Sequence, residues 1–276
     1  MLRSILIGLD GSDDGEAAVE FGLSLAKIHD ALAVGVSIVD ESGIFASEQM
    51  MFASRLDRPF TAPLVDAARH RSRVILEQFT GRCHELHVHC KALSESGTPY
   101  ALVLEEAQRC DLVVIGQRTH FEYGWKDQAD ETLARLLKDS PRPVVTVPKS
   151  PIGGEAVVVA YDGSLQASRA LYSLVAFGLA RSRTVDVVSV ASIRAEAARH
   201  ASRAVEFLRS HDIEVVDHPV DTHIEPAEAI LEEVCRRGAG LLVMGAYGQP
   251  TLREFFIGSV TRSILEKSPV PVFCYH

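Results

Sequence analysis

An internal repeat constrains this chain more than any other feature of its sequence. The segment Ile5–Ser12 reads Ile-Leu-Ile-Gly-Leu-Asp-Gly-Ser, and Val157–Ser164 reads Val-Val-Val-Ala-Tyr-Asp-Gly-Ser. Near the end of each half, the motif Ser-Pro-x-Pro-Val begins at Ser140 and again at Ser268. Because both motifs recur in the same order, we predict two copies of one domain.

The two copies differ in length. Asp10 and Asp162 are 152 positions apart, whereas Ser140 and Ser268 are 128 positions apart, so the first copy carries 24 extra residues. These residues fall within 41–65, for which the second copy has no counterpart. The insertion, which includes Met50, Met51 and Phe52, is either a lid, a partner-binding surface or a short helix that fills the crevice of the first copy.

Length and composition agree with two ordinary domains. A chain of 276 residues suggests two domains of about 140, and we place them at 1–149, with the insertion, and at 150–276. No apolar run is long enough for a membrane span, and the start does not resemble a signal peptide. The five cysteines form no C-x-x-C pair, which argues against a disulfide framework and favours a cytoplasmic location. A net charge of −9 disfavours binding to nucleic acid or anionic membranes.

Short β-branched runs alternate with helical segments in each copy. In the second copy, strands are predicted at 156–160, 185–192, 214–217, 241–244 and 270–275, and helices at 168–181, 193–210, 226–237 and 259–267. This alternation predicts right-handed βαβ units and a parallel sheet with helices on both faces. We therefore expect an α/β fold of two tandem doubly wound, Rossmann-like domains, each with five parallel strands in the order 3-2-1-4-5. Ser12 and Ser164 are expected to cap the helix that follows each first strand.

A glycine-rich loop follows the fourth predicted strand of the second copy. It begins Gly245-Ala-Tyr-Gly248, and Gly258 and Ser259 stand just before a helix with apolar periodicity. Glycines let the backbone approach an anion, and the free amides at a helix amino end attract phosphate oxygens. The Ser259 hydroxyl can donate to a phosphate or cap the helix. In such sheets the ligand crevice lies beyond the carboxyl ends of the strands, where the strand order reverses.

The pattern Gly-x2-Gly-x9-Gly-Ser after a hydrophobic strand resembles the ATP-binding signature of the universal stress proteins, and the resemblance covers nearly the whole chain twice. It implies that Ala160 and Asp162 flank a nucleoside and that Val190 offers backbone contacts to the adenine. It further implies that two short stretches hold the ribose and the phosphates. The residues of these stretches are Met244, Gly245, Gly248, Gly258, Ser259 and Val260.

The same resemblance implies the ligand and the assembly. The ligand is ATP, with ADP or AMP as alternatives and with Mg²⁺ on the phosphates, for which we name no protein ligand. The strands that end each copy, at 143–147 and 271–275, are expected to pair, so that the copies form an intramolecular pseudo-dimer. A homodimer remains open.

The first copy departs from the signature where phosphates would bind. Gly116 is retained, but Thr119 stands at the place of the second glycine, and Asp130 and Glu131 replace the Gly-Ser pair. Two carboxylates would repel a triphosphate, and the alternative, that they cap a helix, also removes the loop. We therefore expect nucleotide in the second copy only. Asp10 is retained, and a structural role in its turn is favoured over a different ligand.

The densest group of potential metal ligands runs from Cys83 to Cys90 and includes His84, His87 and His89. If this segment is the third strand, His87 and His89 point to one face and Cys90 to the other, so the segment alone makes no tetrahedral zinc site. We favour a solvated edge strand, with zinc as the alternative.

The function that these features favour is nucleotide binding in which occupancy acts as a regulatory or structural switch in a stress response. One alternative is a slow ATPase or autophosphorylating enzyme that uses Arg253 and Glu254, and another is a dimerisation module with incidental nucleotide. We name no catalytic residue, because no motif supplies a general base and a second cation to the loop.

Overall fold

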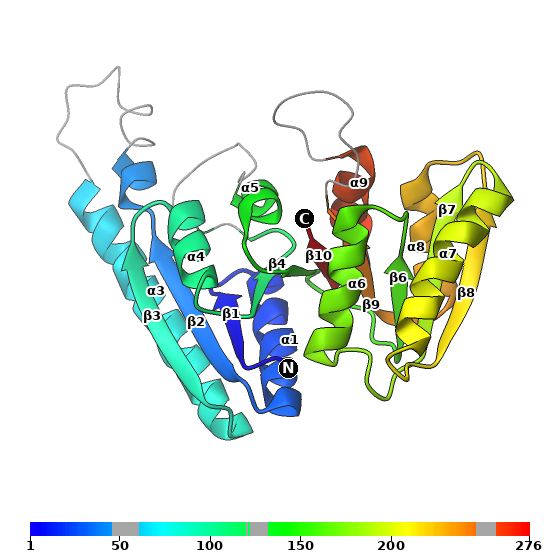
Figure 1. The fold of residues 1–276 in the computed structure, drawn as a ribbon. Coiled ribbons are helices and arrows are strands. Elements are labelled where there is room, and N and C mark those ends of the chain that lie inside the picture. The colour runs from blue at the N-terminus through cyan, green and yellow to red at the C-terminus, as the bar shows by residue number, and fades with distance from the viewer. Residues whose placement is uncertain (46–60, 120, 122–131, 247–257) are drawn as a thin grey trace, which may run out of the picture. The chain divides into compact units, whose positions relative to one another are not determined.

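The computed structural model describes residues 1–45, 61–119, 121, 132–246 and 258–276, and both copies alternate strands with helices (Figure 1). The elements of the first copy are β1 (Ser4–Gly8), α1 (Asp13–His29), β2 (Leu32–Val39), α3 (Thr61–Leu86), β3 (Cys90–Ser96), α4 (Pro99–Ala107), β4 (Leu112–Gly116), α5 (Thr132–Asp139) and β5 (Val144–Val147). Those of the second are β6 (Ala156–Ala160), α6 (Leu165–Phe177), β7 (Val185–Ala191), α7 (Arg194–Arg209), β8 (Val215–Asp221), α8 (Pro226–Arg236), β9 (Ala239–Gly245), α9 (Ser259–Lys267) and β10 (Val272–Tyr275).

The chain divides into two compact units. The amino-terminal unit comprises Arg3–Leu136 and Ser140–Arg142, and its strands lie in the order β3-β2-β1-β4, all parallel. The carboxyl-terminal unit comprises Met1–Leu2, Leu137–Asp139 and Pro143–His276. The predicted boundary between residues 149 and 150 stays a prediction.

Within the carboxyl-terminal unit, the strands lie in the order β5-β10-β9-β6-β7-β8. Reading from β8 to β10, the second copy has the predicted order 3-2-1-4-5 with parallel pairing throughout. The last strand of the first copy, β5, pairs antiparallel with β10, and Val145 lies opposite Phe273. The predicted pairing of the two final strands is therefore confirmed, while the packing of the copies as a pseudo-dimer stays a prediction.

Helices cover both faces of each sheet, as expected for a doubly wound α/β fold (Figure 1). In the amino-terminal unit, α1 and α3 pack together on one face and α4 lies on the other; in the carboxyl-terminal unit, α6 and α7 lie opposite α8 and α9. Central strand residues such as Ile7, Val113 and Val158 are fully buried, because a parallel sheet is covered on both sides. Within the described residues, no helix has the length and apolar character needed to cross a bilayer.

Two elements of the second copy differ most from their predicted bounds. The helix predicted at 168–181 begins at Leu165 and ends at Phe177, where Gly178 adopts a φ of 73°. The strand predicted at 214–217 continues to Asp221 through Pro219. Proline is tolerated here because β8 is an edge strand, hydrogen-bonded to β7 alone within its sheet.

The predicted insertion at 41–65 is partly described. Residues 41–45 are helical, and Asp40 caps this turn by accepting a hydrogen bond from the Gly43 amide at 2.8 Å. The last five positions of the insertion form the first turn of α3, which begins at Thr61. Met50, Met51 and Phe52 lie outside the described residues.

Candidate functional site

The predicted site residues of the second copy gather at the carboxyl ends of three adjacent strands. Ala160, the last residue of β6, lies opposite Val188 on β7 and opposite Met244 on β9. Because β7 and β9 flank β6, the strand order reverses at this point, which is where open α/β sheets bind ligands. Val190 lies near the end of β7, is half-buried and is two residues beyond the position level with Ala160.

The turn from β6 to α6 presents a carboxylate at this edge. Asp162 is exposed, and its Oδ1 accepts a hydrogen bond from the Ser164 amide at 2.9 Å. Ser164 is the N-cap of α6, and its hydroxyl accepts from the Ala167 amide at 3.1 Å. The predicted capping role of Ser164 is confirmed, and the same role is confirmed for Ser12 at the start of α1.

The amino end of α9 carries no side-chain cap among the described residues. Gly258 is the N-cap, with φ −53° and ψ 140°, and Ser259 is the first helical residue. Of the two roles considered for Ser259, capping the helix is therefore wrong, because the cap position falls one residue earlier, on a residue without a side chain. Donation to a phosphate stays a prediction. Gly258 and Ser259 are exposed, and Val260 is half-buried. The first amides of this helix provide the positive end of its dipole.

Gly245 is required by packing in addition to any ligand. A Cβ atom on Gly245 would collide with the backbone of Gln166 and Ala167, and one on Gly116 would collide with the backbone of Asp14 and Gly15. The end of the fourth strand thus touches the start of the first helix in both copies. This glycine by itself does not distinguish a nucleotide-binding copy. Gly248, Asp130 and Glu131 lie outside the described residues.

The two copies orient the aspartate of the first turn differently. Asp10 is 8% exposed, and its Oδ1 accepts hydrogen bonds from the amide and the hydroxyl of Ser12 at 3.0 and 2.8 Å. A Cβ atom on Gly15 would collide with that oxygen, and Ala167 occupies the aligned position in the second copy. Alanine leaves no room for an inward carboxylate, so Asp162 faces solvent. The structural role predicted for Asp10 agrees with this arrangement.

An aromatic side chain fills the crevice of the first copy. Phe121 is fully buried, and its ring lies against Gly8, where an added Cβ would approach the ring to 2.8 Å. Gly8 aligns with Ala160, which the family resemblance places beside the nucleoside. Thr119 is also buried, and its hydroxyl donates to the Gly116 carbonyl at 2.9 Å. In the first copy, buried side chains of the chain itself therefore pack over the end of β1 and just after β4.

The end of β2 is covered as well. Ile38 aligns with Val190 but is fully buried. A hydrophobic cluster joins the end of β2 to helical residues 41–45 and to the start of α3, and it supports the interpretation that the insertion fills the crevice. Its members are Val39, Ile44, Val65 and Ala68.

The sequence did not point to His200, which lies beneath the second-copy turn. Gly163 adopts a φ of 79°, and a Cβ atom there would collide with Nδ1 of the His200 ring and approach its Cε1 to 2.7 Å. This Nδ1 is buried and has no hydrogen-bond partner within the described residues. In the first copy, Gly11 is packed by Ile75 instead. The first-copy turn thus packs against an apolar side chain and the second-copy turn against a polar one. No sequence motif encodes these tertiary contacts.

We expect Gly163→Ala to lower the free energy of unfolding by more than the roughly 1–2 kcal/mol typical of a left-handed alanine, because the new methyl group also meets His200. Urea unfolding measures the effect. Gly238→Ala is the matched control, since Gly238 has a φ of 59° and no atom within 4 Å of an added Cβ. Gly163→Ala should lower the free energy of unfolding more than Gly238→Ala does, and adding His200→Ala to Gly163→Ala should remove this excess. Equal losses in Gly163→Ala and Gly238→Ala would contradict the contact with His200.

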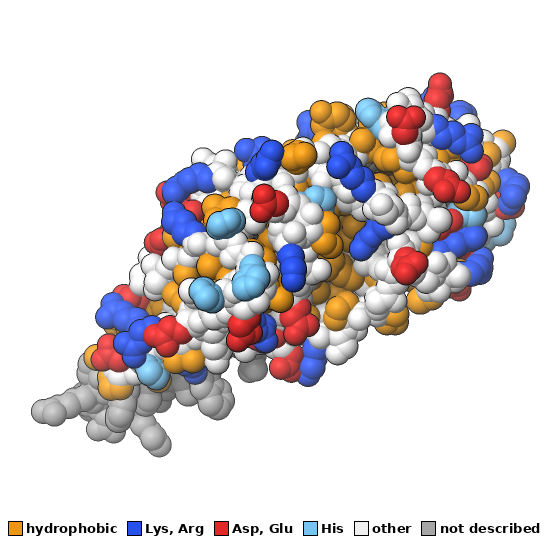
Figure 2. All heavy atoms as spheres, turned by 90° about the horizontal axis from the view of Figure 1, so that it is seen from below, with side chains coloured by type: hydrophobic (Ala, Val, Ile, Leu, Met, Phe, Trp, Pro, Cys, Tyr) orange, Lys and Arg blue, Asp and Glu red, His pale blue; other side chains and the backbone are white. Residues whose placement is uncertain are grey.

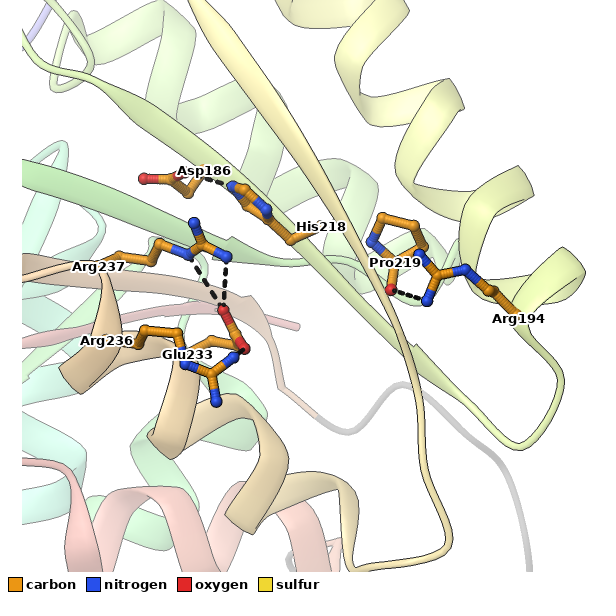
Figure 3. Close-up of polar contacts among 7 residues, drawn as sticks. All are labelled: Asp186, Arg194, His218, Pro219, Glu233, Arg236 and Arg237. Carbon is orange, nitrogen blue, oxygen red and sulfur yellow. Dashed lines mark hydrogen bonds and ion pairs between the residues drawn. The ribbon is translucent and has the colours of Figure 1, made fainter.

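Figure 3 shows polar contacts on β7 and β8 and on α8. Nε2 of His218 lies 2.6 Å from Oδ1 of Asp186, which is near the amino end of β7. On α8, the buried Glu233 forms ion pairs with Arg236 and, at 3.0 Å, with Arg237. The pairing compensates the burial of the Glu233 carboxylate, and these contacts include no predicted site residue.

At the carboxyl end of β8, Arg194, the first residue of α7, makes two further contacts. It donates to the Pro219 carbonyl at 3.4 Å and to the Asp221 carboxylate at 2.8 Å. This hydrogen bond holds the pKa of Asp221 below its ordinary value. Asp221 is therefore engaged by a cation of its own unit.

The cysteine and histidine segment is not the edge strand that we expected. Residues up to Leu86 form the end of α3, and β3 begins only at Cys90. The prediction missed this because the hydrophobic positions of a long helix continue into the segment. Within the described ranges, no three His, Cys, Asp or Glu side chains converge on a metal position. Figure 2 shows acidic and basic side chains interspersed over the face that it presents.

The fold defines a class of protein in which a doubly wound α/β domain is repeated within one chain. In the second copy, an exposed helix amino end follows the fourth strand. The universal stress protein family matches residues 1–148 and 155–276, and the chain belongs to this family in a two-copy form.

Known relatives agree with this assignment. Universal stress protein Slr1230 of Synechocystis sp. is 25% identical over 167 residues, which cover 60% of this chain and 58% of that relative, less than two thirds of its length. A universal stress protein from Archaeoglobus fulgidus has a similar structure, with a TM-score of 0.71, 19% identity and coverage of 99% of this chain and 97% of that one. A functionally unknown protein from Pseudomonas aeruginosa has a TM-score of 0.57 at 14% identity, covering 99% and 92%. These structures show the shared fold.

Proposed function

We propose that the second copy binds one adenine nucleotide at the carboxyl edge of β6, β7 and β9, and that the first copy binds none. The observation that carries the proposal is the asymmetry between the copies. The first copy buries Asp10 and seats Phe121 on Gly8, whereas the second exposes Asp162 and leaves Val190 half-buried.

The groups at this edge suit the parts of a nucleotide. Ala160 and Val190 provide backbone and apolar surface for the base, and the exposed carboxylate of Asp162 can accept hydrogen bonds from ribose hydroxyls. The amides at the start of α9, from Ser259 onward, can donate to phosphate oxygens. A protein with a net charge of −9 needs such a local array of donors to hold an anion.

We assign ATP as the ligand, with ADP and AMP as alternatives. Magnesium would arrive on the phosphates, because it usually keeps most of its ligands as phosphate and water oxygens. No trio of metal-binding side chains converges in the part of the chain that the structure describes. Occupancy would act as a switch by joining the start of α9 to the ends of β6 and β9 through the bound nucleotide.

Calorimetric titration with ATP tests the proposal through a pair of aligned variants. The wild-type chain should bind one ATP, and Asp162→Ala should weaken binding by about tenfold to a hundredfold, the value of a hydrogen bond to a charged group. Asp10→Ala should leave the affinity unchanged while lowering stability, since that carboxylate supports its own turn. Two ATP molecules per chain, or equal loss of affinity in both variants, would contradict it.

A phosphate-release assay on the purified protein separates binding from catalysis. A nucleotide-binding switch should release phosphate at well below about 1 per second, the lower range of ordinary enzymes. Turnover above that rate would favour the alternative of an ATPase. Arg253 and Glu254, which that alternative would use, lie outside the described residues.

A further inference from the structure

Two thiols of the first copy meet where α3 turns into β3. The helix ends at Leu86, and the turn is closed by a hydrogen bond from the Val88 amide to the Cys83 carbonyl at 2.9 Å. His87 reverses the chain with a φ of 57°. Because β3 then begins at Cys90 and packs against α3, the Cys83 and Cys90 side chains come close enough to interact.

The two thiols differ in their access to solvent. Cys83 is fully buried, whereas Cys90 is partly exposed. Burial, and then the interaction with Cys90, raise the pKa of the Cys83 thiol to about 12. Since the thiolate is the reactive form of cysteine, Cys83 resists oxidants by itself. An oxidant from solvent reaches Cys90 first.

We propose that Cys83 and Cys90 form a reversible disulfide that makes the first copy a redox-responsive unit. The oxidant is a hydroperoxide. The Cys90 sulfur attacks one peroxide oxygen, the O–O bond breaks, and water or an alcohol leaves, which yields a sulfenic acid. The Cys83 sulfur then attacks the Cys90 sulfur; the S–O bond breaks, and the departing hydroxide takes the Cys83 proton as water. Two electrons pass to the peroxide in total, and a small dithiol reverses the reaction by exchange.

The position of the pair gives the disulfide a structural consequence. It would join the end of α3 to the start of the edge strand β3 across a short loop. The same helix carries Ile75, which packs on Gly11 beside Asp10. Oxidation would therefore tighten the first copy, while nucleotide occupancy concerns the second, so that the two copies would receive different signals.

Trypsin provides a direct assay on the full-length chain. Arg82 precedes Cys83, and Lys91 follows Cys90, so one peptide, 83–91, contains both thiols and no others. After treatment with hydrogen peroxide and alkylation of the remaining thiols, this peptide should appear without alkyl groups and lighter by two hydrogen atoms. Dithiothreitol should restore the doubly alkylated form. The exposed Cys235 is the internal reference for a thiol that peroxide oxidises, and the buried Cys274 is the reference for a thiol that the fold protects.

Two variants make the assay decisive. Cys90→Ala should leave Cys83 alkylatable after unfolding at every peroxide dose, because the accessible thiol is gone. Cys83→Ser should stop the reaction at Cys90 sulfenic acid, detected with a dimedone probe. The proposal is overturned if wild-type peptide 83–91 stays doubly alkylated at a dose that oxidises Cys235, or if Cys90 accumulates as sulfenic acid despite Cys83.

Discussion

Replacing Gly258 by aspartate should weaken ATP binding by at least tenfold and leave the fold intact. Gly258 precedes the exposed first turn of α9, and a Cβ atom there would meet nothing within 4 Å. Its extended backbone suits a capping side chain, so aspartate should bind the free amides and stabilise the helix. The same carboxylate would compete with the phosphates for those amides. It would also repel them, by about 1 kcal/mol at 4 Å in water and about 4 kcal/mol near a protein surface.

Gly258→Asn separates the charge from the cap. Asparagine caps a helix about as well as aspartate but carries no charge, so its loss of affinity should be clearly smaller. Calorimetric titration gives the two dissociation constants, and about 1.4 kcal/mol corresponds to each tenfold change. Thermal unfolding should show both variants at least as stable as wild type. If aspartate and asparagine bound ATP as tightly as glycine does, phosphates would not lie at the start of α9, and the proposed site would be misplaced.

Phe121→Ala should lower the free energy of unfolding by about 3–5 kcal/mol, the usual effect of removing a fully buried aromatic ring. The ring fills the space over Gly8, and an alanine would leave a cavity at the end of β1. The midpoint of urea unfolding for the first copy measures the effect. ATP affinity should stay unchanged, because the proposed site belongs to the second copy.

Phe45→Ala is the matched control for this substitution. Phe45 lies in the helical residues 41–45, but its side chain is 50% exposed, so its truncation should cost well under half as much. Equal losses for the two phenylalanines would show that Phe121 does not fill the crevice. A second ATP bound by Phe121→Ala would show that the ring alone excludes nucleotide from the first copy.

Local signals in the sequence predict much of the second copy. The strand predicted at 156–160 and the helix predicted at 259–267 begin and end at those residues in the structure. Pro226 opens α8 as predicted, because proline fits the first turn of a helix. The bounds of these elements can be predicted because the spacing of hydrophobic residues, and the glycine, serine and proline residues at element ends, act over only a few positions. The parallel direction of the strands follows from their alternation with helices.

Features that depend on distant contacts could not be predicted in the same way. Phe121 has no periodic context, and only the structure places its ring on Gly8. Gly245 has the residue type of a phosphate loop, yet the aligned Gly116 shows that helix packing already requires it. The contact between His200 and Gly163 joins two elements of the fold, and nothing near either residue in sequence announces it.

The place of β5 means that the duplicated halves are not separable modules. This strand is encoded in the first half, but it belongs to the compact unit of the second, where its backbone pairs with β10. A fragment that starts at residue 150 would leave β10 as an open sheet margin, with a row of amides and carbonyls ready to recruit a foreign strand. A fragment that starts at Leu137 would keep its own strand in that place. Loss of the first half would therefore expose the backbone of β10 in the second half.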